Sequence, residues 1–407
     1  MKIFDYKYRA RRLKDGKIVK GITEAPNKAM VDKFLQEQSL KPIEIYQHKS
    51  IMQRLNRITL GRVMKERDLI FYLKQMSSLL NAGIKLNEAS EMLATQQTNK
   101  AIRRILYGIY YEVNSGQTLA DSYKEYPNDF PKILISMVQV GEKTGDLKGA
   151  VSQIINYFET QYRLKSSISA TLMMPVIYLI VGLIVAAVLT LLVMPQFESM
   201  FSAVDGVEMP GVTRFFIDMG NFVKSNGLLI ILFMIGSVFL HKYLSKKWNK
   251  YQIFISATAI RMPILGQVVK LNNLSRIAST LSQMLNNHVP LQDCLATTYD
   301  TVGNKIYKDL IIKAQKNVNN GEFMSKVFEN HYAIEVVFVR MISVGERTGE
   351  LGNMLKSLSA FYDEDSEVKI ERLKKAIEPV LLLFIFSLIT VMLLAVMLPT
   401  FSFTSQL

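Results

Sequence analysis

Three long uncharged apolar runs stand out along the chain. They are Val176 to Met194, Leu228 to Leu240 and Val380 to Leu398, with 19, 13 and 19 residues. A membrane-spanning helix needs about 20 apolar residues, so the first and third runs predict transmembrane helices 176–194 and 380–398. The second run, 228–240, is short, and we expect it to span either by recruiting Gly220 to Gly227 or through local thinning of the bilayer. The pattern therefore predicts three transmembrane helices.

Upstream of the first and third runs, apolar residues recur at the helical period. The faces that they form contain Leu69, Tyr72, Met76 and Leu80 in one region and Leu274, Ile277, Leu281 and Leu285 in the other. Breaks rich in Gly, Asn and Pro divide each region into about six helices. We expect two helical bundles, at 66–175 and 271–379.

The last helix of each bundle continues into the apolar run, from Leu147 to Met194 and from Leu351 to Leu398. Each helix would be roughly 70 Å long, so about half of it must lie outside the bilayer. Prolines lie where each helix enters the membrane, predicting a kink, and after each apolar run, predicting the helix end. Pro175 and Pro379 lie at the membrane entry, and Pro195 and Pro399 follow the apolar runs.

The two regions are copies of each other, at an offset of 204 to 205 residues. The segment from Met137 to Leu147 aligns with Met341 to Leu351, with seven of eleven positions identical. One residue is lost in the second copy between Gly321 and the Gly-Glu motif. A repeat of this kind indicates a duplicated structural unit.

Residues 1–50 do not belong to the repeat. Alternating aromatic residues, a Lys-Asp-Gly-Lys turn and a second apolar segment predict a small hairpin, followed by a helix over Ala25 to Gln38. Residues 51–65 form a basic linker with helical spacing. This linker either lies on an anionic membrane face or packs, solvated, on the bundle.

Charge distribution sets the expected orientation. Residues 1–175 carry 28 basic and 17 acidic side chains, residues 195–227 carry 2 and 4, and residues 241–379 carry 19 and 14. By the positive-inside rule, both bundles, the N-terminus and a basic linker at 241–270 are cytoplasmic. The loop 195–227 and the tail 399–407 are then external. The single cysteine, Cys294, excludes an intramolecular disulfide framework.

The repeated Gly-Glu motif superficially resembles a phosphate-binding loop, but Glu142 precedes Lys143 and the flanking sequence is helical. We interpret it as a tight turn between helices. The two glycines would allow positive φ, the threonine would cap the long helix, and the glutamate would accept buried backbone N–H groups. These residues are Gly141, Glu142, Thr144 and Gly145 in the first copy and Gly345, Glu346, Thr348 and Gly349 in the second.

No residue pattern indicates catalysis, a cofactor or a resident metal. The four histidines form no spaced pair on a helix face. The acidic cluster from Asp363 to Glu367 is compatible with a divalent cation or, alternatively, with a solvated face paired to Lys369 and Arg372. The apolar runs contain no Asp, Glu, Lys, Arg or His, which argues against a pore or a proton-coupled carrier.

The duplicated Gly-Glu-Lys/Arg-Thr-Gly-x-Leu turn, the prolines and the N-terminal module resemble the GspF/PilC family over residues 3–401. These are inner-membrane platform proteins of type II secretion and type IV pilus machines. The resemblance implies a non-enzymatic, multi-pass scaffold of the bacterial inner membrane, with its N-terminus in the cytoplasm. It also implies partners: a cytoplasmic hexameric assembly ATPase, pilin or pseudopilin transmembrane helices, other inner-membrane assembly proteins, membrane lipid and further copies of itself. Nucleic acid is not among them.

Two other classes remain as alternatives. A membrane transport component ranks second and a membrane-bound enzyme third. Secretion, type IV pilus and competence machines are not distinguished by the sequence.

Overall fold

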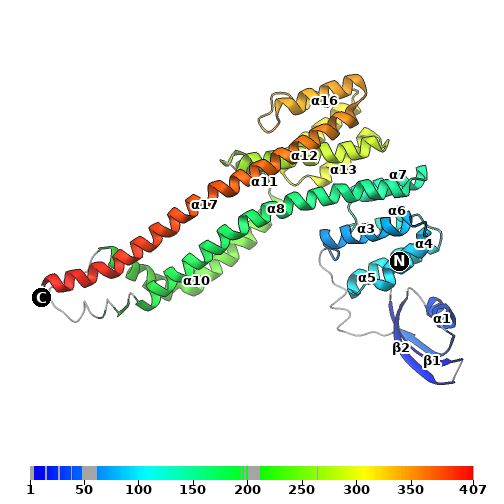
Figure 1. Ribbon diagram of the computed structural model, residues 1–407, viewed down its shortest axis with the longest axis horizontal. Helices are drawn as coiled ribbons and strands as arrows, with labels where there is room; N and C mark the ends of the chain where they lie inside the picture. The colour runs from blue at the N-terminus through cyan, green and yellow to red at the C-terminus, as the bar shows by residue number, and fades with distance from the viewer. Residues whose placement is uncertain are drawn as a thin grey trace.

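The computed structural model describes residues 4–13, 16–25, 28–37, 39–47, 62–193, 195–196, 199, 211–263 and 265–406. Figure 1 shows a small sheet with one helix, a group of bundle helices, and long helices that extend away from the bundles. The predicted mainly helical fold with a small N-terminal α/β module is confirmed.

The N-terminal module contains β1 (Phe4–Arg12), β2 (Ile18–Ala25), α1 (Lys28–Glu37) and β3 (Leu40–Gln47). The strand order is β2-β1-β3, and both strand pairs are antiparallel. The predicted hairpin is therefore present, and β3 is an additional strand that the sequence analysis did not predict. The module has its own core, formed by Tyr6, Ala10, Val31, Leu35 and Leu40. Residues 51–61 of the predicted basic linker lie outside the described residues.

Six described helices form each copy of the repeat. The first copy contains α3 (Glu66–Asn81), α4 (Leu86–Gln96), α5 (Lys100–Asn114), α6 (Leu119–Lys124), α7 (Lys132–Thr144) and α8 (Leu147–Val188). The second contains α12 (Leu265–Asn286), α13 (Leu291–Thr301), α14 (Lys305–Asn319), α15 (Ser325–Phe328), α16 (Val336–Thr348) and α17 (Leu351–Gln406). Equivalent side chains cap α5 and α14: Asn99 and Asn304 each accept a hydrogen bond from a first-turn backbone N–H.

One continuous hydrophobic core runs through both bundles. It includes Leu73, Met76 and Ile154 from the first copy and Leu281 and Leu355 from the second. Burial of these apolar faces is the main force that holds the amphipathic helices together. Because the core is continuous, the two copies form one packed unit.

Helices α8 and α17 leave the bundles side by side, as Figure 1 shows. Their outer halves are long and apolar enough to cross a membrane, and their side chains there are mostly exposed. A short π-helical stretch, η1 (Leu189–Val193), continues α8. Pro195 and Gln196 are also helical, so the described residues show no helix end directly before Pro195.

Helix α10 (Gly211–Lys247) lies between the two copies in sequence and corresponds to the predicted second span. It starts inside the range 195–227 predicted as a loop, because helical apolar spacing already begins near Phe215. A bend of 44° separates Gly211–Ile230 from Leu232–Ser245. The described chain thus holds two unbroken candidate spans, or up to four if each bent helix pair counts as one. Helix α11 (Asn249–Arg261) occupies much of the predicted linker 241–270.

Candidate functional site at the Gly-Glu turns and the bundle interface

Each Gly-Glu motif joins the last short helix of a bundle to its long helix. Gly145 follows α7 with φ 78°, and Gly349 follows α16 with φ 76°. Both glycines thus have the left-handed conformation that the sequence predicts, in which a residue with a Cβ is strained. The chain reverses here within two residues.

The first glycine of each motif has a different role from the one expected. Gly141 and Gly345 do not have positive φ; they lie inside α7 and α16 and are buried. A Cβ on Gly141 would lie 2.7 Å from Ala150 Cβ, and a Cβ on Gly345 would lie 2.8 Å from Leu351 Cα. These glycines are therefore required for the close approach of the long helix to the short one, rather than for backbone conformation.

The glutamates accept backbone hydrogen bonds from another helix. Glu142 Oε1 and Oε2 accept from the N–H groups of Leu119 and Ala120, at 2.5 and 3.1 Å. Glu346 accepts in the same way from Met324 and Ser325, at 2.7 and 3.2 Å. The first N–H groups of a helix have no partner within it, so the carboxylates cap α6 and α15 from a distance. The predicted role of the glutamates is confirmed.

The threonines do not cap the long helices. Thr144 Oγ1 donates to the carbonyl of Val140, and Thr348 Oγ1 donates to that of Val344. Asp146 is the N-cap of α8, and its carboxylate accepts from Gly149 N–H at 2.9 Å. The prediction was wrong because Thr144 still belongs to α7, so only the residue directly before Leu147 can reach the free N–H groups.

The prolines divide neither long helix. Helix α8 continues through Pro175, and α17 continues through both Pro379 and Pro399 to Gln406. The expectation that Pro399 ends the helix is thus wrong. A proline removes only one N–H donor, and apolar helices of this kind tolerate that loss.

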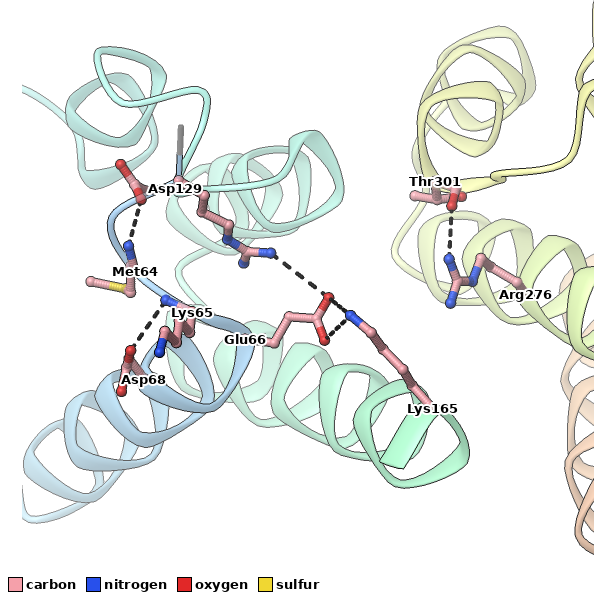
Figure 2. Close-up of polar contacts among 9 residues, drawn as sticks. Met64, Lys65, Glu66, Asp68, Asp129, Lys165, Arg276 and Thr301 are labelled. Carbon is pink, nitrogen blue, oxygen red and sulfur yellow. Dashed lines mark hydrogen bonds and ion pairs between the residues drawn. The ribbon is translucent and has the colours of Figure 1, made fainter. Parts of the chain in front are cut away.

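The two copies meet along the long helices α8 and α17, and α7 and α8 of the first bundle also contact α12 and α13 of the second. Tyr157 Oη and Thr280 Oγ1 are buried 3.1 Å apart, and Arg276 Nε donates to Gln161 Oε1 at 3.0 Å. Arg276 also donates to the carbonyl of Thr301, as Figure 2 shows. At the edge, Lys132 pairs with Asp300 at 2.7 Å. A cavity of about 480 Å³ lies beside this contact and has Arg276, Asp300 and Thr301 in its lining.

A buried aspartate fixes the chain where it enters the first bundle. Asp129 accepts from the N–H groups of Val63 and Met64, both at 2.7 Å. Figure 2 shows the bond from Met64. Nearby, Lys165 of α8 pairs with Glu66 of α3 at 2.9 Å. The sequence analysis missed Asp129, since nothing in its neighbourhood distinguishes it from a solvated loop carboxylate.

Several buried groups have shifted pKa values. Burial raises the pKa of Tyr72 and of Tyr123, whose hydroxyls are 2.9 Å apart. Burial also raises the pKa of Asp363, although a hydrogen bond from Ser275 partly opposes this effect. Burial and nearby Lys313 lower the pKa of His331. None of these groups forms a nucleophile–base pair with another in the described residues.

The acidic cluster forms ion pairs in the structure. Glu367 pairs with Arg163 of α8 at 3.2 Å. Glu159, the equivalent of Asp363 in the first copy, pairs with Lys74. Among the described residues, no group of three His, Cys, Asp or Glu side chains could hold a metal ion. The arrangement is suited to fixing helices and joining two bundles.

A family model described as "Type II secretion system (T2SS), protein F" matches residues 72–195 and 277–399, more than half of the chain. The chain belongs to this family. Each of the two segments that match the family model begins in the first helix of a bundle and ends at or just beyond an apolar run. The internal repeat predicted from the sequence is therefore confirmed.

Similar proteins of this family come from several bacteria. The type II secretion system protein F of Pseudomonas aeruginosa is 29% identical over 389 residues, covering 95% of this chain and 96% of the relative. The type IV pilus assembly protein PilC of Myxococcus xanthus is 28% identical over 397 residues, covering 96% and 93%. PilC of Thermus thermophilus is 24% identical over 409 residues, covering 100% and 99%. The resemblance to the GspF/PilC family is confirmed, and it supports a role in secretion or pilus assembly.

Proposed function

We propose that this protein is a non-enzymatic, multi-pass inner-membrane scaffold of a type II secretion or type IV pilus machine. Its cytoplasmic bundles would bind a hexameric assembly ATPase and other assembly proteins. Its membrane part would contact pilin or pseudopilin transmembrane helices and lipid. The scaffold would couple movement of the ATPase to the insertion or removal of a pilin subunit.

The observation that carries this proposal is the continuity of the two long helices. In α8, Ile154 and Tyr157 are buried in the bundle, whereas the side chains from Met173 onward are mostly exposed and apolar. Helix α17 is built in the same way from Leu355 to Leu383. Each of these two helices rises about 1.5 Å per residue and contains no loop. A tilt of the bundle would therefore also move the apolar half of the helix.

A membrane transport component is the second candidate. Transport of a charged solute or a proton normally requires charged or proton-binding groups at membrane depth, and the apolar runs of α8, α10 and α17 contain no Asp, Glu, Lys, Arg or His. Uptake or release of ions and small solutes by proteoliposomes containing the purified chain would support this alternative.

The test of the coupling proposal interrupts α8 where it leaves the bundle. Four glycines inserted between Ser166 and Ser167 should leave the bundle and the apolar half intact but make their connection flexible. Secretion or pilus assembly in the host cell should then be lost, although the chain still inserts and still co-purifies with the ATPase. The same insertion after Ser115, in the exposed turn between α5 and α6, is the control and should retain activity. Equal activity of both variants would show that α8 does not transmit movement.

The basic N-terminal module is our candidate for docking the ATPase. It carries 12 basic and 6 acidic residues in 50 positions and has a core separate from that of the bundles. A chain that lacks residues 1–50 should insert, yet bind the ATPase less tightly, with the largest deficit at low salt. Unchanged binding at every salt concentration would mean that the charge only reflects positive-inside bias and that the bundles bind the ATPase.

A further inference from the structure

Apart from the contact between the equivalent long helices α8 and α17, the two bundles meet through unlike faces. Helices α7 and α8 of the first bundle contact α12 and α13 of the second. Within the described residues, α3 and α4 make no comparable contact with α16 or α17. This part of the pairing is therefore heterologous, and each copy leaves one of the two faces uncovered. We call these uncovered surfaces the α16–α17 face and the α3–α4 face.

The α16–α17 face exposes positions that are buried in the first copy. Ile133 and Tyr157 are 1% and 5% exposed beside the second bundle. Their equivalents 204 residues later, Val337 and Phe361, are 51% and 52% exposed. Helices α7 and α8 have the second bundle against them at these positions, whereas no described bundle covers the equivalent positions of α16 and α17.

The α3–α4 face contains the equivalents of the α12 and α13 residues that contact the first bundle. Arg276, which donates to Gln161 across the interface, corresponds to Phe71, and Phe71 is 61% exposed. Thr297 is buried, whereas its equivalent Met92 is exposed. Both positions thus expose a large apolar side chain, which is suited to burial against a partner.

The two free faces also match each other in charge. Within the chain, the interface has an ion pair between Lys132 and Asp300. At the equivalent places, the free faces have Val336 and Thr95, so both members of the pair are uncharged. A contact between the free faces would bury apolar side chains without leaving one of these charges unpaired.

We propose that the α16–α17 face of one chain docks on the α3–α4 face of a second copy, repeating the contact between the two bundles. Phe361 would occupy the place of Tyr157, and Phe71 that of Arg276. In Figure 1 the second bundle lies above α7 and α8, and α3 to α5 lie below them, so the two free faces are at opposite ends of the pair.

The geometry of the long helices is compatible with this assembly in a membrane. Arg163 of α8 pairs with Glu367 of α17, and these two residues are equivalents in the repeat. The rotation that superposes one copy on the other therefore involves no large shift along the axis of the long helices. Repeating it between chains would keep every apolar segment at the same depth and would give a row or ring parallel to the membrane.

The test is a cross-link between two differently tagged full-length chains co-expressed in membranes. One chain carries Phe361→Cys and the other Gln75→Cys, the equivalents of Tyr157 and Thr280. A short bismaleimide, which alkylates two thiols without an oxidant, should join the chains only when both variants are present. Burial raises the pKa of the native Cys294 thiol to about 12, so this residue should remain outside the reaction.

Two controls define the result. Tyr157→Cys with Thr280→Cys in one chain should be joined within the chain by the same bismaleimide, because the side chains at these positions meet in the structure. Adding Phe71→Glu to the Gln75→Cys chain should lower the interchain yield at least about fivefold, whereas Phe323→Glu, at another exposed phenylalanine, should not. The proposal is overturned if the internal pair closes but the interchain pair does not. It is equally overturned if Phe361→Cys cross-links to itself, because that result indicates a two-fold contact.

Discussion

In both bundles the same glutamate contacts stabilise the Gly-Glu turn region. The loops that precede α7 and α16, in contrast, are stabilised by different side chains. In both, a glutamate accepts two backbone N–H groups, from Leu119 and Ala120 in one copy and their equivalents in the other. Before α7, the buried carboxylate of Asp129 accepts backbone hydrogen bonds. Before α16, Tyr307 Oη instead donates to the carbonyl of Ala333 at 2.7 Å.

We infer that the Gly-Glu turn tolerates few substitutions, whereas the loops before α7 and α16 tolerate several. The turn requires backbone conformation and close helix contact, which only a glycine provides at two of its positions. The loops require only that buried polar groups find a partner, and a carboxylate or a phenol can each provide one. Four changes should test how far the two copies are energetically alike.

The largest effect is expected where the short and long helices touch. A Cβ in Gly345→Val would lie 2.8 Å from Leu351 Cα, a backbone atom, so α16 and α17 must separate. We expect a loss of about 3 kcal/mol in the free energy of unfolding, and a similar loss for Gly141→Val. Thermal and chemical unfolding of the detergent-solubilised chain would measure it. Gly303→Val is the control, because nothing lies within 4 Å of a Cβ there.

Removing the glutamate caps should have the next largest effect. Glu142→Ala and Glu346→Ala each leave two helix N–H groups without their acceptor, at a cost of about 2 kcal/mol. Hydrogen exchange at the first turns of α6 and α15 should speed up in the corresponding variant only. Glu91→Ala, on an exposed position of α4, is the matched control. A much larger loss in one copy would show that the turns are not equivalent.

A smaller change tests one position at which the copies differ. Gly83 has φ 82°, and its equivalent His288 has φ 59°, so a histidine occupies the left-handed conformation in the second copy. His288→Gly should therefore raise the stability of the chain by about 1 kcal/mol, and Gly83→His should lower it by a similar amount. Unfolding curves of both variants, compared with the parent, give the sign. Two changes of the same sign would contradict this reading.

The smallest effect concerns two carboxylates at equivalent positions of the repeat, Asp363, which is largely buried, and Glu159, which is exposed and paired with a lysine. Burial raises the pKa of Asp363, so the folded chain holds this proton more tightly than the unfolded chain does. The group therefore costs stability as pH rises through its raised pKa, and Asp363→Asn should stabilise the chain at neutral pH by less than about 1 kcal/mol. The gain should vanish in acid, where the carboxyl is already protonated. Neighbouring Glu367 strengthens the shift, whereas Arg163 opposes it.

Glu159→Gln is the partner experiment. Glu159 forms an exposed ion pair with Lys74, so its loss should cost about 0.5 kcal/mol or less at neutral pH. Unfolding at neutral and acid pH would separate the two variants by sign. Destabilisation by Asp363→Asn at neutral pH would mean that the bond from Ser275 outweighs burial.

The repeat, the six helices of each copy and the long helices could be predicted because each leaves a periodic or duplicated pattern. The left-handed glycines and the glutamate acceptors also follow from local chemistry. The buried role of Gly141 could not be predicted, since it depends on how closely α8 approaches α7. Asp129 was missed for the same reason: its partners, Val63 and Met64, are more than 60 residues away in sequence.

Strand β3 was missed because of a proline. Pro42 lies within Leu40–Gln47, and proline normally argues against a strand. The strand is at the edge of the sheet, and its register with β1 shifts between Arg9 and Ala10, so the missing donor is tolerated there. Neither the edge position nor the shift is visible before the strands are paired.

The parallel course of α8 and α17 has a consequence for how the two copies are connected. Two units that point the same way cannot be joined head to tail unless the polypeptide travels back along its own length. Helix α10 makes this return, and it lies outside both matched segments of the family. The return helix also packs on α17, where buried Thr213 donates to the carbonyl of Ala395 and Phe216 and Ile217 share a core with Met392. The connection between the copies is therefore a structural part of the apolar half of the molecule as well as a link.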